Sequence, residues 1–230
     1  MQLTKIKIKN YRLLIEAELE VDPRTTLIVG RNNTAKTSCF SCIGKVLDGE
    51  TVSFDDYPLV RRKEFYKKID LFMEKKLAYE DFCKKIDVIS IEFLVDYSLD
   101  DPDDNLGALS PFIIDVDVDT TTALIRAEYR LKTDEKSLWS LLESSYYKDG
   151  AYSPSEEAHK ELVDNFGKLF GLTVYAVNPN NPEDKQVKSQ KELHDLFPFH
   201  AIPAERVLGE EDTHNSSLGS LISGFFDTSE

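Results

Sequence analysis

Apolar and polar residues alternate along two segments near the N-terminus. In Leu3–Lys9 the apolar side chains alternate mainly with lysines, and in Ile15–Val21 they alternate with glutamates. A period of two is typical of half-buried strands, so we predict two strands that pair with each other. A turn signal at Asp22-Pro23-Arg24 follows. The next run, Thr25–Val29, is short, apolar and β-branched, and it predicts a buried strand.

Beyond this run the pattern changes repeatedly between helical and strand-like spacing. Helices are expected at Lys36–Leu47, at 61–87 as one or two helices, at Glu135–Tyr147 and at Ser155–Phe170, the last preceded by a Ser-Pro capping sequence. Strands are expected at Val88–Tyr97, Phe112–Asp119, Ala123–Lys132, Leu172–Val177 and Phe199–Ile202. The second and third of these strands should form a hairpin, and a polar stretch, 178–195, precedes the last strand. These elements predict an α/β fold in which a mixed sheet has antiparallel strands at the N-terminus and carries inserted helices.

Composition places the chain among globular proteins. It has 230 residues, of which 41% are hydrophobic and 30% charged, and it contains no run of eighteen apolar residues that could span a membrane. The N-terminus lacks the apolar core of a signal peptide. Cys39 and Cys42 form a C-x-x-C pattern, which could indicate redox or zinc chemistry, but no second Cys or His pair accompanies it. We interpret these thiols as packed and reduced, and we expect a cytoplasmic location and no membrane partner.

Charge is distributed unevenly. The net charge is −14, and residues 96–230 carry 11 basic and 27 acidic side chains, whereas residues 1–50 carry 8 basic and 6 acidic ones. Neutralising nucleic-acid phosphates needs clustered Lys and Arg. We therefore expect this chain to be a poor DNA binder by itself, with any DNA contact made by other segments or by a basic face near the N-terminus.

One motif carries recognisable chemistry. The segment Gly30-Arg-Asn-Asn-Thr-Ala-Lys-Thr37 fits G-x-x-x-x-[GA]-K-[ST], between a predicted strand and a predicted helix. Backbone N–H groups at a helix N-terminus form a site for anions, a lysine adds a charge against the β- and γ-phosphates, and a threonine hydroxyl joins the Mg²⁺ shell. We predict that ATP and Mg²⁺ bind here, with Thr37 as the metal ligand. The predicted nucleotide-binding residues of this P-loop are Gly30, Arg31, Asn32, Asn33, Thr34, Ala35, Lys36, Thr37 and Ser38.

Ala35 departs from the strict motif, which has Gly at this position. A Cβ restricts the backbone angles and narrows the approach to phosphate, so affinity and hydrolysis are open questions. The alternative interpretation of the whole segment is an ordinary polar loop that ends in a capping Thr.

The motif and its surroundings resemble the opening of the SMC/RecF-like ABC ATPases. The residues concerned are Ile6-Lys-Ile-Lys-Asn-Tyr-Arg12, a second strand, and then Leu27-Ile-Val-Gly-Arg-Asn-Asn33. Within that group the chain is most similar to the OLD (overcoming lysogenization defect) ATPase–nucleases, on three further segments: Val52–Tyr57, Ile86–Asp96 and Phe199–Arg206.

The resemblance implies roles for residues outside the loop. Asn10 and Arg12 would lie beside the nucleotide, with Arg12 near its base or phosphates, and Arg206 would mark a turn near the γ-phosphate. Surface or salt-bridged loop arginines remain the alternative for both. The resemblance also implies a homodimer or higher oligomer formed through the ATPase heads, and a DNA-directed nuclease domain or partner in anti-phage defence.

Several parts of such an ATPase are not found by sequence. We identify no signature segment, no strand ending in Asp-Glu and no switch His. Phe112–Asp115 resembles the start of a Walker B strand, but it continues as an alternating acidic strand, and Asp115-Val-Asp117 lacks the context of a nuclease site. No catalytic residue is assigned, and enzyme activity stays uncertain. We expect residues 1–206 to be the N-terminal portion of an ABC-type ATPase domain with an insertion at about 55–170, and 207–230 to be a flexible acidic tail or the start of a further lobe. The chain would then be a fragment or one partner of a split system.

Two alternative functions remain open. One is a binding module in which ATP holds a dimer or scaffold together with little hydrolysis. The other is a RecF-like or SMC-like DNA-repair head without a nuclease.

Overall fold

The computed structural model describes residues 1–31, 35–98, 106–115, 117, 119–155 and 157–200. Met1–Phe199 forms one compact unit, and His200–Glu230 is grouped as a second. Only His200 of the second unit lies within the described residues, so the predicted tail 207–230 and Arg206 lie outside them. The architecture given below is that of the first unit.

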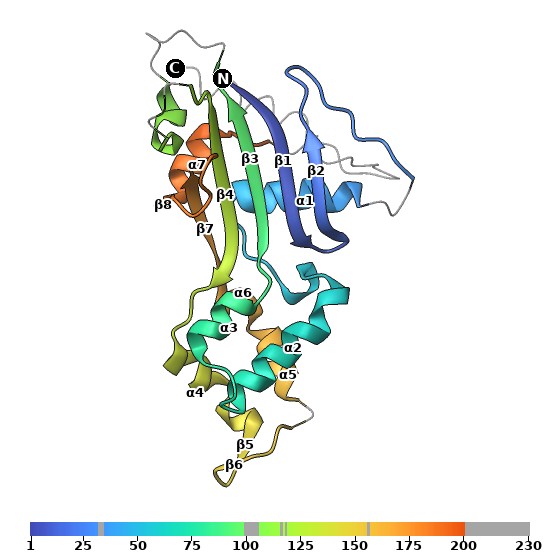
Figure 1. The fold of residues 1–230 in the computed structure, drawn as a ribbon. Coiled ribbons are helices and arrows are strands. Elements are labelled where there is room, and N and C mark those ends of the chain that lie inside the picture. Colours follow the sequence, from blue (N-terminus) through green and yellow to red (C-terminus); the bar gives the residue numbers. More distant parts are fainter. Residues whose placement is uncertain (32–34, 99–105, 116, 118, 156, 201–230) are drawn as a thin grey trace, which may run out of the picture. The chain divides into compact units, whose positions relative to one another are not determined.

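A six-stranded sheet forms the centre of this unit, with the strand order β2-β1-β3-β4-β7-β8 (Figure 1). Its strands are β1 (Gln2–Tyr11), β2 (Leu14–Glu20), β3 (Ile89–Asp96), β4 (Thr122–Leu131), β7 (Phe170–Val177) and β8 (Lys185–Lys188). Every pairing between them is antiparallel. The α/β fold class is therefore confirmed, with the described part of the sheet antiparallel throughout.

The alternating N-terminal segments form the pair of strands that their pattern predicts. In the β1–β2 register Ile6 lies opposite Leu19 and Ile8 lies opposite Ala17. Both isoleucines are buried, because side chains two residues apart point to the same face of a strand. The lysines between them point to the other face.

Two helices cover the buried face of the sheet. Helix α1 (Lys36–Leu47) crosses the strands and contacts β1 and β3, while α7 (Gln190–Leu196) contacts β7 and α1 (Figure 1). Helix α1 has the predicted bounds. It buries Cys42, Ile43, Val46 and Leu47 against fully buried strand residues such as Ile91. The burial of these apolar side chains fixes the helix on the sheet.

The opposite face of the sheet carries charges of alternating sign. Across the strands, Lys7 lies between Glu18 and Glu92, and Glu92 lies opposite Arg126. Lys7 Nζ is 3.2 Å from the Glu18 carboxylate, and Arg126 Nε is 2.7 Å from that of Glu92. The basic residues of β1 therefore have acidic partners and do not form a purely basic surface.

A group of helices lies beyond one end of the sheet (Figure 1). It comprises α2 (Leu59–Met73), α3 (Tyr79–Lys85), α4 (Glu135–Tyr146), α5 (Ala158–Asp164) and α6 (Phe166–Leu169), with a small hairpin of β5 (Tyr147–Lys148) and β6 (Ala151–Tyr152). Aromatic rings form its core, where Phe65 packs against Phe54 and Phe166 with centroids 5.6 and 6.0 Å apart. The predicted helices in 61–87 and at Glu135–Tyr147 are confirmed.

The helix predicted over Ser155–Phe170 is only partly correct. The segment forms two helices: α5 begins at Ala158 after the N-cap Glu157, and the helix is interrupted at Asn165, after which α6 begins. Asn165 leaves the helical backbone angles, with φ −102° and ψ 5°, and its side-chain amide also donates to the Glu161 carbonyl, at 2.9 Å.

Two strand predictions are wrong. Thr25–Val29 forms no strand with any described residue, and Leu27 and Val29 are 80% and 77% exposed instead of buried. Phe112 ends the 3₁₀ helix η2 (Gly107–Phe112), and the described residues from Ile113 to Asp119 form no hairpin with β4. Strand β4 already pairs with β3 on one edge and with β7 on the other.

The polar stretch 178–195 contains two elements that its composition concealed. Strand β8 extends the sheet at its edge, and α7 begins after Ser189, whose hydroxyl and amide exchange bonds with Glu192 in a capping box. The strand predicted at Phe199–Ile202 is not found at Phe199 or His200, and its last two residues lie outside the described part of the chain.

Candidate functional site

The predicted P-loop leads directly into helix α1. Gly30, Arg31 and Ala35–Ser38 are described, whereas Asn32, Asn33 and Thr34 lie outside the described residues. Ala35 is the N-cap of α1 and has left-handed backbone angles, φ 64° and ψ 10°. An L-residue with a Cβ pays a steric cost in this region, which explains why the motif usually has Gly at this position.

Lys36 closes the loop from the helix side. Its Nζ donates hydrogen bonds to the carbonyl oxygens of Gly30, at 2.5 Å, and Arg31, at 2.6 Å. The Lys36 side chain therefore joins the helix end of the loop to its first two residues, with the ammonium group at the positive end of the dipole of α1. A single lysine charge beside helix N–H groups is the arrangement that binds phosphate oxygens.

The two hydroxyl residues that follow Lys36 differ in exposure. Thr37 is exposed in the first turn of α1, which suits a hydroxyl that would meet a metal ion. Ser38 is only 9% exposed and points toward the protein interior. The structure therefore places Lys36 and Thr37 at the loop, while the nucleotide contacts predicted for all of these residues stay predictions.

A pocket of about 420 Å³ lies next to the described part of the loop. Gly30, Ala35 and Lys36 contribute to its wall. Most of the remaining wall is apolar and comes from the buried face of the two N-terminal strands, with Ile6, Ile8, Leu14 and Leu19 among its residues. The pocket therefore has a largely apolar wall, to which Lys36 at the loop and Glu18 on β2 add one charge of each sign.

Asn10 and Arg12 lie at the turn between β1 and β2, and both have left-handed backbone angles, with φ 57° and 49°. The Asn10 amide donates to the Val88 carbonyl at 3.0 Å, which ties the end of β1 to the residue before β3. The Arg12 backbone amide donates to the Asp56 carbonyl at 2.7 Å. The Asn10 side chain and the Arg12 backbone are therefore engaged with the protein, and the nucleotide contacts that the resemblance implies for both residues stay predictions.

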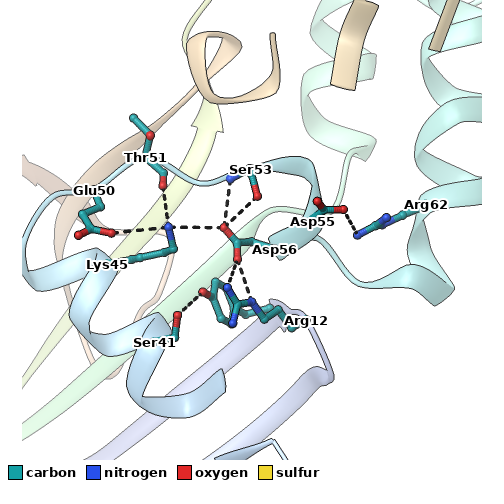
Figure 2. Close-up of polar contacts among 10 residues, drawn as sticks. Arg12, Ser41, Lys45, Glu50, Thr51, Ser53, Asp55, Asp56 and Arg62 are labelled. Carbon is teal, nitrogen blue, oxygen red and sulfur yellow. Dashed lines mark hydrogen bonds and ion pairs between the residues drawn. The ribbon is translucent and has the colours of Figure 1, made fainter. Parts of the chain in front are cut away.

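The Arg12 side chain joins a polar cluster around Asp56 (Figure 2). Arg12 Nε and Nη2 lie 2.9 and 2.8 Å from Asp56 Oδ1. Asp56 Oδ2 accepts a hydrogen bond from the Ser53 amide at 3.1 Å and faces Lys45 Nζ at 3.7 Å. Asp56 belongs to a short 3₁₀ helix, η1 (Phe54–Asp56), which lies between α1 and α2.

The cluster keeps a buried carboxylate ionised. The Asp56 side chain is only 3% exposed, and burial by itself raises the pKa of a carboxyl group. Hydrogen bonds from the Ser53 amide and the Arg12 guanidinium, with the charge of Lys45, outweigh this effect and bring the pKa of Asp56 below its ordinary value. The carboxylate is thus a fixed negative charge that holds two cations.

Sequence reasoning noted Asp56 only as part of the segment Val52–Tyr57, without a role, and it did not single out Lys45. The available signal was the Ser53-x-x-Asp56 spacing, because a serine followed three residues later by an acid is a capping pattern. That Arg12 is the partner of Asp56 could not be read from the sequence, since 44 residues separate them.

Other candidates from the sequence have structural roles. Cys39 and Cys42 are free thiols, and burial raises the pKa of both. No group of three or more potential metal ligands is found in the described ranges.

Asp115 accepts hydrogen bonds from the Asp117 amide and the Asn180 side chain, and these bonds stabilise the loop around it. No helix in the described part of the chain is long and apolar enough to cross a membrane.

Comparison with known proteins gives one family. The family model AAA_15, described as an AAA ATPase domain, matches residues 1–218. No curated protein matches the chain.

Proposed function

The chain belongs to the AAA ATPase domain family, and from this premise we propose that it holds ATP·Mg²⁺ at the loop from Gly30 to Thr37. The observation that carries the proposal is the position of Lys36, whose ammonium group lies across the carbonyls of Gly30 and Arg31 at the N-terminus of α1. In the proposed complex, Lys36 turns from these carbonyls to the phosphates, Thr37 supplies a magnesium ligand, and the loop amides bind phosphate oxygens.

We further propose that hydrolysis needs groups beyond those described. The run Thr25–Val29, which leads into the loop, forms no strand pairing with any described residue. An ATPase of the SMC/RecF-like type would complete the site with a further lobe and with a second head placed across the nucleotide. This part of the proposal rests on the resemblance of the first fifty residues to that group.

The biological role that we propose is that of an OLD-like ATPase whose nucleotide state gates a DNA-directed nuclease in anti-phage defence. The support is the resemblance of Val52–Tyr57, Ile86–Asp96 and Phe199–Arg206 to that family. The lysines of β1 have glutamate partners on β2, with Lys9 Nζ 3.0 Å from the Glu16 carboxylate. DNA contacts are therefore assigned to other parts of the intact protein.

A scaffold that binds ATP with slow turnover is the second candidate function. The left-handed Ala35 favours it, because a Cβ at this position of the loop narrows the approach to phosphate. The two candidates share the binding step and differ in hydrolysis, so the turnover of the full-length protein separates them.

Isothermal titration calorimetry with ATP and Mg²⁺ tests the binding step. We expect the wild-type chain to bind and Lys36→Ala to bind roughly 10- to 100-fold more weakly, since a hydrogen bond to a charged group contributes about 1.5–3 kcal/mol. Lys76→Ala is the matched control, because Lys76 is 61% exposed and pairs with Glu74 away from the loop. Equal binding by the wild type and Lys36→Ala would contradict the proposal, as would the absence of binding by the wild type.

A further inference from the structure

The polar cluster around Asp56 rests on the face of α1 that begins at Thr37. Ser41 lies four residues after Thr37 and Lys45 four residues after Ser41, and this spacing places all three on one face of the helix. The Tyr11 hydroxyl and Ser41 Oγ are 2.9 Å apart, and Lys45 faces Asp56 at 3.7 Å. Figure 2 shows Arg12 and Lys45 in contact with the Asp56 carboxylate, and Ser41 on the same helix as Lys45.

We propose that Asp56 is a positioning residue for the nucleotide site, an inference that rests on the proposed ATP binding. Its buried carboxylate joins the β1–β2 turn, through Arg12, to the P-loop helix, through Lys45. The orientation of α1 against the sheet, and with it the direction of the loop amides, depends on this junction.

The geometry of the cluster makes it a rigid junction. Asp56 is bound through both carboxylate oxygens, through its backbone carbonyl and within the capping box of η1. Removing one partner of a buried ion pair leaves the other charge uncompensated, which is strongly unfavourable. The guanidinium of Arg12 therefore stays with Asp56, while its 40% exposure leaves one edge of the side chain at the surface.

The junction matters for phosphate binding because the anion site is built from the first turn of α1. Oriented N–H groups bind an oxygen well only within a narrow range of positions, and a displacement of about 1 Å in an active site can change rates by about 100-fold. A helix that has lost one of its lateral supports samples a wider range of orientations. We therefore expect nucleotide affinity to fall while the chain remains folded.

The test is the affinity for ATP·Mg²⁺, measured by calorimetry, of Asp56→Asn and of its neighbour variant Asp55→Asn. Both substitutions remove one acid from η1 with nearly unchanged shape. Asp55 is 91% exposed and pairs with Arg62 at the surface, so Asp55→Asn should bind as the wild type does, within about two-fold. Asp56→Asn should bind about 10-fold more weakly. Circular dichroism at the titration temperature establishes that both variants are folded.

Two further variants separate positioning from a general loss of structure. Asp56→Glu keeps the charge and should recover part of the affinity that Asp56→Asn loses. Combining Arg12→Gln with Asp56→Asn should weaken binding no more than the stronger single substitution, because both act on one junction. If Asp56→Asn does not fold, Arg12→Lys tests the same contact, since it keeps the charge compensation but cannot donate from two nitrogens to Oδ1.

The outcomes distinguish this inference from the function on which it rests. Wild-type binding that Lys36→Ala weakens and Asp56→Asn leaves unchanged would overturn the positioning role alone. Additive effects of the Arg12 and Asp56 substitutions would also overturn it. Absence of binding by the wild-type chain would overturn the proposed function, and the positioning role with it.

Discussion

Replacing Ala35 by Gly tests the strain at the P-loop. Ala35 has φ 64° and ψ 10°, in the left-handed region, which costs an L-residue about 1–2 kcal/mol that glycine does not pay. Glycine in turn loses more conformational freedom on folding, at a cost of roughly 0.5–1 kcal/mol. The difference predicts a net stabilisation by Ala35→Gly of about 0.5–1 kcal/mol.

Ala78→Gly is the matched control for this substitution. Ala78 is also a helix N-cap without a side-chain hydrogen bond, but its φ of −67° and ψ of 150° are ordinary for alanine. The preference of the N-cap for Gly over Ala and the entropy of the unfolded chain then affect both variants equally. The stability of Ala35→Gly should therefore exceed that of Ala78→Gly by about 1–2 kcal/mol, which is the left-handed cost alone.

Thermal unfolding followed by circular dichroism provides the assay, with urea unfolding as a second measurement of the free energy. A change of 1 kcal/mol shifts the midpoint of a domain of this size by roughly 2–4 °C. The midpoint of Ala35→Gly should rise, and its affinity for ATP·Mg²⁺ should equal or exceed that of the wild type. A midpoint of Ala35→Gly at or below that of Ala78→Gly would refute the assignment of strain to Ala35.

Three further predictions concern the rest of the fold. The buried hydroxyl of Tyr57 has no hydrogen-bond partner among the described residues, so Tyr57→Phe should raise the free energy of unfolding by about 1 kcal/mol. Tyr129→Phe loses a 2.9 Å bond to the Glu50 carbonyl and should lower the free energy of unfolding by about 1 kcal/mol. Urea unfolding of both variants checks this prediction, and two changes of the same sign would contradict it. The pKa of Asp56 is lower in the folded chain than in the unfolded chain, so its charge stabilises the fold at pH values above about 4. This contribution is lost as the pH falls through the folded-state pKa, and the stability difference between the wild type and Asp56→Asn should therefore shrink on acidification. A constant difference from pH 7 to pH 3 would refute this prediction. Ser189→Ala removes the capping box of α7 and should lower the free energy of unfolding, measured by thermal unfolding, by about 1 kcal/mol. The control Ser140→Ala, at an exposed position of α4, should change it by less than about 0.5 kcal/mol. Equal effects of the two substitutions would show that the cap contributes nothing.

Local patterns in the sequence were sufficient for the elements whose stability is mostly local or one-sided. The alternation in Leu3–Lys9 and Ile15–Val21 predicted a strand pair because one face of each is apolar and the turn between them is short. Helix α1 was predicted with its observed bounds because its apolar spacing and its N-terminal loop agree. The P-loop motif and the position of Lys36 were likewise available from the sequence, since all their residues lie within eight positions of one another.

The predictions that were wrong concern segments whose structure depends on residues far away in the chain. Thr25–Val29 has the composition of a buried strand, yet it pairs with no described strand, although the outer edge of β2 has no described partner. Composition therefore does not determine whether a segment joins a sheet. Phe112–Asp119 alternates correctly, but both edges of β4 pair with other strands. The arrangement around Asp56 belongs to the same class. Burial of its carboxylate, compensated by Arg12 at a separation of 44 residues and by Lys45 on α1, arises only when the β1–β2 turn, the helix and η1 meet, because charge compensation in the interior depends on distance in space and not along the chain.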